Sequence, residues 1–271
     1  AMFMQIPFLE LQQAFANRRF VGALLLANFV LVPLLVWLLT LPLSTNKALL
    51  VGALLVLLTP CIDYVVVFTH LGKGDSRLVL AATPLLLLLQ LLMLPVYLKL
   101  MLGTQVDTVI AIRPFAEAFL LLIVAPLGLA VATELSARRS AAVRIWSAGW
   151  AWLPVPAMAV VLVTVIGSQI AAVAQQLEVL APLLPVYAAF MLLAPALGAF
   201  SARLFRLAAP AARAVAFSTS TRNSLVVLPL ALALPEPISG LAARAVITQT
   251  LVELVGELIY LRAIPALVRG I

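Results

Sequence analysis

Long hydrophobic runs separated by short polar segments make up almost the whole chain. Eight runs are long enough to cross a bilayer as helices, which takes about 20 residues. They cover 20–40, 48–71, 77–102, 115–135, 143–167, 179–203, 211–234 and 241–265. Because a backbone in lipid must satisfy its own hydrogen bonds, the pattern predicts an all-α integral membrane protein. A shorter apolar stretch, Ala1–Phe15, precedes these spans, and we interpret it as the tail of a helix whose beginning is missing.

The composition supports this interpretation. Of the 271 residues, 65% are hydrophobic and 10% are charged, and the mean hydropathy is +1.20. A soluble domain carries about 25% charged residues, so this chain could not cover a water-facing surface. The single cysteine excludes an internal disulfide and a multi-cysteine metal site, and the single histidine limits the enzymatic options. We expect neither an enzyme nor a resident cofactor.

The net charge of +7 lies mainly in the loops between spans, so it indicates membrane orientation rather than binding to nucleic acid. With eight spans, twelve basic residues lie on one side and four on the other, and Arg222 lies inside a span. The richer side should be cytoplasmic, together with the C-terminus. We expect the plasma membrane, in bacteria the inner membrane, with lipid as a constant partner. The sequence leaves the oligomeric state open.

An internal repeat relates the two ends of the chain. Leu31-Val32-Pro33 matches Leu193-Ala194-Pro195 at an offset of 162, and Tyr97-Leu98 matches Tyr260-Leu261 at an offset of 163. Gln90 is the mate of Glu253 in the same repeat, also at an offset of 163. Five spans separate the mates, so the two copies should have opposite orientations in the membrane. Inverted repeats with interrupted helices are typical of secondary transporters, and the interruptions mark the binding site.

The first interruption lies in the second span, at 58–64. Pro60 removes a backbone donor, and we expect Thr59 to cap a new half-helix that has Pro60 at its first position. Cys61 and Asp63 would then lie at the positive end of that half-helix. A kinked but continuous helix is the alternative, although a carboxylate within a span is rare and is usually functional.

The second interruption, at 218–224, consists of seven consecutive polar residues in the seventh span, and the offset between Cys61 and Arg222 is 161. An ordinary loop here would leave two flanking segments too short to span. We therefore predict a second broken helix, and we predict that Arg222 pairs with Asp63 or with an anionic substrate. The candidate substrate-binding residues of both breaks are Cys61, Asp63, Thr219, Ser220, Thr221, Arg222 and Asn223.

The last span carries the polar residues best suited to coupling transport to an ion. Gln249, Glu253 and Glu257 are spaced four residues apart and share one helix face. With Asp63 and Gln90, Gln249 and Glu253 form the candidate ion-coupling set, for H⁺ or Na⁺. The alternative for Glu257 is a solvated position near the interface. His70, near the end of the second span, is interpreted as a helix-end histidine.

Three segments resemble the bile acid:sodium symporter superfamily, and its arsenite efflux branch in particular. They are Phe29 to Leu39, Pro60-Cys61 followed by Leu71-Gly72-Lys73-Gly74-Asp75, and Phe217 to Ser224. The resemblance implies ten helices in two inverted repeats of five, with broken, crossing fourth and ninth helices. It also implies panel-like helices at 1–16, 115–135 and 143–167, and core-like helices at 20–102 and 179–265.

In the arsenite branch, the cysteine at the fourth-helix break, here Cys61, is implicated in metalloid transport. The chain departs from that branch at Arg222, where an asparagine is usual, and at Leu225, where a glutamate is usual. Either the coupling carboxylate has moved, to Asp63 or Glu253, or the substrate differs. We therefore expect proton-coupled efflux of arsenite or a related oxyanion. The alternatives are sodium-coupled symport of a small organic anion and a membrane sensor that transports nothing.

Overall fold

The computed structural model describes residues 17–103, 117, 120–150, 156, 160, 163–164, 167 and 176–269, and these residues are almost entirely helical. The stretch 1–16 lies outside the described residues, so the interpretation of the N-terminal segment stays a prediction. Within the described residues, three uninterrupted helical segments are long and apolar enough to cross a membrane: Arg18–Leu43, Ser76–Leu102 and Leu183–Leu204. The count of eight spans also stays a prediction, because parts of 104–175 lie outside the described residues.

The first half of the packed body contains one long helix with a π-turn, one broken helix and one continuous helix. The first comprises α2 (Arg18–Leu26), η3 (Ala27–Leu31), α3 (Val32–Thr40) and the 3₁₀ turn η4 (Leu41–Leu43). The broken helix consists of α4 (Lys47–Leu57) and α5 (Val65–Leu71), and α6 (Ser76–Leu102) follows it. The short side chains of Asn17, Asn46 and Asp75 cap α2, α4 and α6 by accepting amide hydrogen bonds in the first turn.

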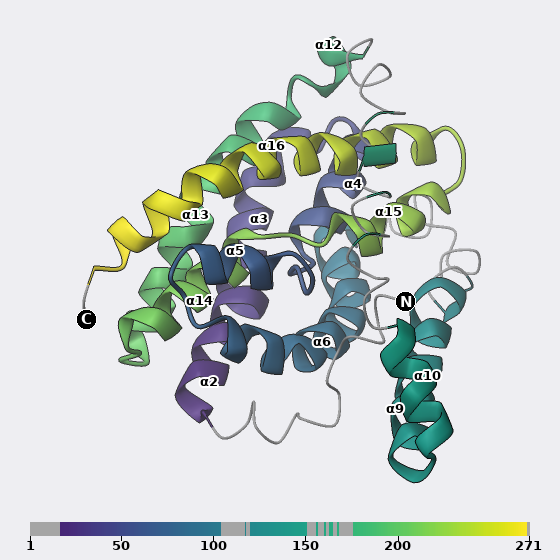
Figure 1. Cartoon of the computed structure of the whole chain (residues 1–271). Helices are drawn as coiled ribbons and strands as arrows, with labels where there is room; N and C mark the ends of the chain where they lie inside the picture. Colours follow the sequence, from purple (N-terminus) through teal and green to yellow (C-terminus); the bar gives the residue numbers. More distant parts are fainter. Residues whose placement is uncertain are drawn as a thin grey trace.

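The second half begins with the short α12 (Leu177–Leu180) and the long α13 (Leu183–Leu204). The second broken helix consists of α14 (Ala209–Ser220) and α15 (Ser224–Leu232), and α16 (Ile238–Leu267) is the longest helix described. Helices α14 and α16 cross the body next to the first-half helices, with α13 packed on α14 and α16 packed on α4 (Figure 1). The two halves therefore interlock rather than lying side by side as separate domains.

Residues 120–150, which lie between the halves, form a hairpin of their own. It contains η6 (Leu120–Val124), α9 (Ala125–Arg139) and α10 (Ala141–Trp150), and α9 packs against α10 at one edge of the molecule (Figure 1). Helix α9 ends at Arg139, four residues beyond the predicted limit of that span. The predicted panel-like segments fall in this region and in 1–16, so their role stays a prediction.

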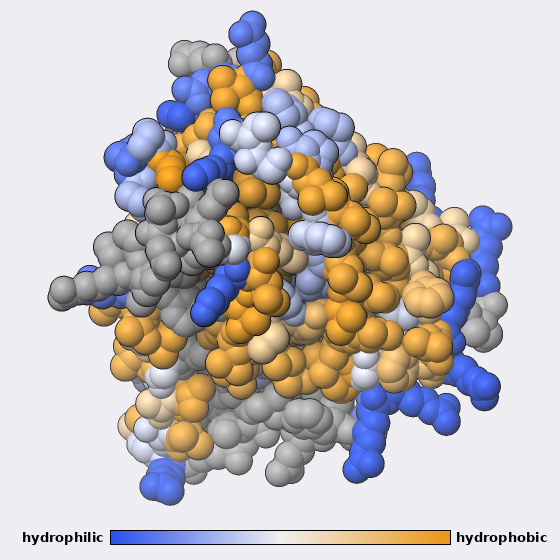
Figure 2. Space-filling model, turned by 180° about the vertical axis from the view of Figure 1, so that it is seen from behind, coloured by the Kyte–Doolittle hydropathy of each residue, from blue (hydrophilic) through white to orange (hydrophobic). Residues whose placement is uncertain are grey.

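Hydrophobic side chains cover much of the outside of the body as well as its interior. Leu192 and Leu100 are 77% and 74% exposed, although both lie on long apolar helices. Figure 2 shows such residues across the middle of one face, with hydrophilic residues gathered toward its periphery. A surface of this kind suits contact with lipid tails, which confirms that the protein is embedded in a membrane.

Two prolines, Pro33 and Pro195, occupy positions that the sequence offset of 162 matches. A proline within a helix leaves the carbonyl four residues before it without an amide donor. Pro33 does this to Phe29, whose oxygen accepts a hydrogen bond of 2.7 Å from the hydroxyl of Tyr97. Pro195 does it to Met191, whose oxygen accepts a hydrogen bond from Tyr260. The residues matched by sequence offset thus make matched contacts.

Basic residues assigned to the cytoplasmic side meet at one end of the body. Arg213 donates to the carbonyls of Lys73, at 3.2 Å, and Val268, at 3.3 and 3.2 Å. Arg203 donates to Leu267 at 3.5 Å, so α13, α14, the turn between α5 and α6, and the end of α16 come together here. These bonds also satisfy carbonyls at the C-terminus of α16, which its own helix leaves unpaired.

Candidate functional site

The two broken helices cross at their interruptions and hydrogen-bond to each other through their backbones. Pro60 and Arg222 form an isolated antiparallel bridge. The amide of Cys61 donates to Thr221 O at 3.0 Å, and the amide of Asn223 donates to Thr59 O at 2.9 Å. The predicted crossing is therefore present, and the alternative of a continuous kinked helix at Pro60 is wrong.

The details of the breaks differ from the prediction in two respects. The hydroxyl of Thr59 donates backward to Leu55 O at 3.0 Å, and α5 begins only at Val65. Thr59 therefore does not cap the second half-helix, because the bridge holds this stretch extended. In the other break, 218–220 remain helical at the end of α14, and only 221–223 are irregular.

The hydroxyls at the end of α14 are satisfied mainly by their own helix. Thr219 and Ser220 donate to the carbonyls four residues earlier, at 2.7 and 2.8 Å. Thr221 lies 2.7 Å from Phe217 O and 2.6 Å from an oxygen of Glu257, so its hydroxyl joins α14 to α16. Asn223 caps α15 by accepting a hydrogen bond from the amide of Val226 at 3.2 Å.

Glu253 is the carboxylate that binds the second break. It is completely buried, and its Oε2 accepts hydrogen bonds from the amide of Arg222 at 2.9 Å and from Gln249 Nε2 at 2.5 Å. Its Oε1 lies 2.6 Å from the hydroxyl of Tyr64, which also lies 3.0 Å from Arg222 O. The predicted face of α16 therefore points into the crossing. Glu257 is completely buried on this face too, so the alternative of a solvated interface position is wrong.

This arrangement can hold Glu253 in either protonation state without moving a heavy atom. Two N–H groups point at Oε2, so a proton on this carboxyl group belongs on Oε1. In the ionised form, the hydroxyl of Tyr64 donates to Oε1. In the protonated form, Oε1–H donates to Tyr64, whose own proton turns to Arg222 O. Tyr64 thus relays the protonation state of Glu253 to the backbone of the break.

Arg222 lies at the centre of the crossing with none of its surface exposed. Its guanidinium donates hydrogen bonds to amide carbonyl oxygens rather than to a carboxylate. The acceptors are Asn28 Oδ1 at 2.9 Å, Ser218 O at 3.0 Å, Leu57 O at 3.3 Å and Thr219 O. Its Cζ lies 5.4 Å from the centre of the Phe190 ring, within reach of a cation–π interaction. Nε is buried without a hydrogen-bond partner among the described residues.

The predicted pairing of Asp63 with Arg222 is wrong. Asp63 lies in the irregular segment between α4 and α5, half buried, and one of its carboxylate oxygens has no partner among the described residues. The guanidinium turns instead to carbonyls that the two breaks leave free, and Glu253 takes the backbone amide of the same residue. Contacts with freed backbone groups therefore replace the expected ion pair.

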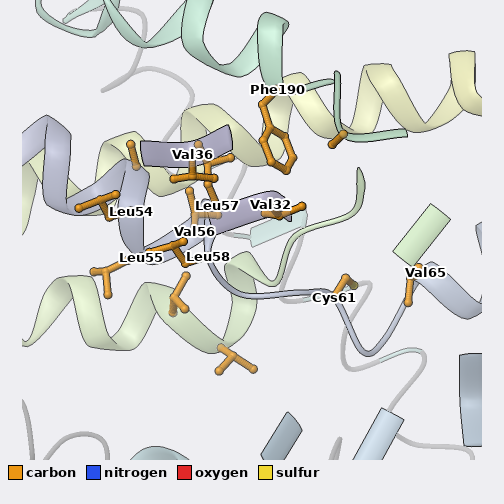
Figure 3. Close-up of a cluster of buried hydrophobic side chains, with 14 of the residues drawn as sticks. Val32, Val36, Leu54, Leu55, Val56, Leu57, Leu58, Cys61, Val65 and Phe190 are labelled. Atoms are coloured by element: carbon orange, nitrogen blue, oxygen red, sulfur yellow. The ribbon is translucent and has the colours of Figure 1, made fainter. Parts of the chain in front are cut away.

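Cys61 and Gln90 are also buried, with different surroundings. Cys61 follows the bridge on the extended segment beyond α4, completely enclosed, and Figure 3 shows it together with Phe190 and the leucines of α4. It is a free thiol that is near enough to Asp63 and Glu253 to interact with them electrostatically. Both polar atoms of the Gln90 side chain lack a partner among the described residues, so it does not share the network of Glu253.

The sequence analysis did not identify three residues of the site: Asn28, Tyr64 and Phe190. Asn28 is an amide within the first span, five residues before Pro33, and it lies in the π-turn η3. An asparagine inside an apolar span, close to a proline, was the signal that the sequence offered. The π-turn found there is of a kind that is frequent at functional sites. Tyr64 ends the first break and was passed over beside Asp63. Nothing in the local sequence singles out Phe190.

A comparison with known families gives a match over residues 1–181. The family is described as the Sodium Bile acid symporter family. The matched part includes the first break, with Pro60 and Cys61, but not the second break. The comparison with curated proteins gave no match.

Proposed function

Because this chain belongs to the sodium bile acid symporter family, we propose that it is a secondary active transporter that exports arsenite or a related oxyanion in exchange for protons. Members of this family are membrane transporters rather than enzymes. The proposal places the protein in the bacterial inner membrane, with the C-terminus in the cytoplasm. The cargo would pass the crossing of the two breaks while the surrounding helices alternate between inward-open and outward-open arrangements.

An inverted repeat is part of this proposal, and two sets of contacts support it. Tyr97 and Tyr260 each bind the carbonyl freed by a proline in the matching helix of its half. The two breaks, related by the same sequence offset, meet in an antiparallel bridge. A pair of inverted copies brings equivalent interruptions together at mid-membrane in this way.

The observation that carries proton coupling is the bonding of Glu253 to the break itself. The carboxyl group holds the Arg222 amide through Oε2 and reaches the Arg222 carbonyl through Tyr64. Loss or gain of a proton therefore changes the hydrogen bonding of the residue at which the two helices cross. Among the described residues no cationic side chain forms an ion pair with this completely buried carboxyl group, so a proton is the simplest means of neutralising it.

The choice of cargo rests on Cys61. A trivalent arsenic species binds soft thiolates, and this thiol lies beside the bridge, next to Asp63 and the polar end of α14. A single thiol would bind the metalloid weakly, as suits a transporter that must release its cargo. We include Asp63, Thr219, Ser220, Thr221, Arg222 and Asn223 in the same binding region.

Arsenite tolerance in a sensitive bacterial strain tests the proposal. The native chain should raise the arsenite concentration at which growth stops, and Cys61→Ser should remove most of that protection at equal expression. Ser201→Ala is the matched control, because it removes a buried hydroxyl that donates to Ala23 O outside the crossing. It should protect as the native chain does. Absence of protection by the native chain would refute arsenite as the cargo. Full protection by Cys61→Ser would refute the role of the thiol.

Sodium-coupled symport of a small organic anion is the second candidate, because the description of the matched family names sodium and bile acid. Here Arg222 would attract the anion, and its Nε, which has no hydrogen-bond partner among the described residues, would be the available donor. Uptake of a labelled organic anion that depends on a sodium gradient would favour this candidate over arsenite efflux.

A further inference from the structure

Three backbone carbonyls at the crossing have lost the amide partners that an unbroken helix would supply. They belong to Leu57, Ser218 and Thr219, and the amides four residues ahead belong to Cys61, Arg222 and Asn223. Each of these amides is bonded elsewhere, to Thr221 O, Glu253 Oε2 and Thr59 O, respectively. The bridge and Glu253 together therefore leave three carbonyl oxygens free at the C-terminal ends of α4 and α14.

These oxygens form a cage that favours a cation. The C-terminal ends of two half-helices direct their negative dipole ends toward it, and Asn28 Oδ1 adds a fourth oxygen from the π-turn. Unwound carbonyls and half-helix C-termini are the groups with which transporters hold a coupling sodium ion. The family description names sodium, so the fit of sodium to this cage can be examined directly.

The guanidinium of Arg222 already fills the cage. Nη1 donates to Leu57 O, and Nη2 donates to Asn28 Oδ1, Ser218 O and Thr219 O. Nη2 carries two hydrogens but faces three acceptor oxygens, so it cannot donate a separate hydrogen bond to each of them. Such a surplus of oxygens suits a centre of positive charge. A sodium ion in the same cage would have to lie against the fixed positive charge of Arg222, so it does not fit.

We propose that Arg222 is a tethered cation that takes the place of a coupling sodium ion, so that the protein works without sodium. This inference rests on the proposed function as a transporter, although its binding part can be measured separately. Because the cation is covalently attached, it cannot be exchanged during transport. The oxygens of α4, α14 and the π-turn stay bound together throughout, and the exchangeable charge is left to Glu253.

The test compares melting temperatures of the purified full chain in sodium, potassium and choline chloride at equal ionic strength. The native protein should melt at the same temperature in all three salts. Arg222→Ala should melt lower in choline chloride and should regain stability selectively in sodium chloride or on addition of millimolar guanidinium. Arg213→Ala is the matched control. Arg213 is also an α14 arginine that donates to backbone carbonyls, but it is only half buried and lies away from the crossing. It should respond equally to every salt.

Either of two results would overturn the inference. One is a sodium-specific stabilisation of the native protein, which needs no variant to be folded. The other is a folded Arg222→Ala that gains no more from sodium or guanidinium than Arg213→Ala gains. If Arg222→Ala cannot be purified, Arg222→Lys replaces it and should stay insensitive to sodium because a tethered charge remains. Failure to transport any tested cargo would refute the proposed function and would leave these melting results unaffected.

Discussion

The most informative perturbation is a pair of substitutions at Glu253. Alanine leaves the buried Arg222 amide and Gln249 Nε2 without an acceptor. A buried donor left unpaired costs ~1–3 kcal/mol, so two donors cost about 4 kcal/mol. At ~3 °C per kcal/mol for a chain of this size, Glu253→Ala should lower the melting temperature by about 12 °C.

Glutamine at the same position should be far milder. Its carbonyl oxygen can take the place of Oε2 and accept from the same two donors, and its NH₂ can take the place of Oε1 and donate to Tyr64. Tyr64 then donates to Arg222 O, as it does when Glu253 is protonated. Glu253→Gln should therefore lower the melting temperature by only about 3 °C, corresponding to ~1 kcal/mol.

Thermal unfolding of the purified protein in detergent, followed by intrinsic tryptophan fluorescence, separates the two outcomes. The predicted order of melting temperatures is native, then Glu253→Gln, then Glu253→Ala well below both. Equal losses for glutamine and alanine would refute the hydrogen-bond arrangement, because they would mean that the negative charge itself holds the site. An alanine variant as stable as the native chain would show that Glu253 does not bind the break.

Three further predictions use the same melting assay. Tyr97→Phe and Tyr260→Phe each remove the donor to a carbonyl that a proline leaves unpaired. Each substitution should lower the free energy of unfolding by about 1 kcal/mol and the melting temperature by ~3 °C. Unchanged melting temperatures for both variants would contradict the matched contacts. Gly52→Ala would place a Cβ 2.6 Å from Ala242 O and 2.7 Å from Ala245 Cβ, so it should force α4 from α16 at a cost of ~1–3 kcal/mol. Its control is Gly240→Ala, whose Cβ would meet Arg244 at 3.8 Å; equal melting of the two glycine variants would contradict the packing.

The sequence located both breaks because the local signals were strong. A proline within an apolar run and seven polar residues in a row cannot continue an ordinary membrane helix without help from neighbours. The face shared by Gln249, Glu253 and Glu257 followed from helical periodicity alone. All three are buried, and two bind the second break directly.

The partners of Arg222 were beyond sequence reasoning. Opposite charges suggested Asp63, but the guanidinium binds carbonyls, which carry no signal in the identity of their residues. Which carbonyls are free depends on the bridge between two segments about 160 residues apart, and that contact is tertiary. The same bridge explains why Thr59 does not cap α5. Asn28 contacts Arg222 across 194 residues, for which no local pattern exists.

The most direct test of the account is arsenite flux in proteoliposomes under imposed ion gradients. The account predicts that a pH gradient drives arsenite movement by the native chain, that a sodium gradient of equal size does not, and that Glu253→Gln loses the response to pH. Movement driven by the sodium gradient, or an undiminished response to pH in Glu253→Gln, would contradict it.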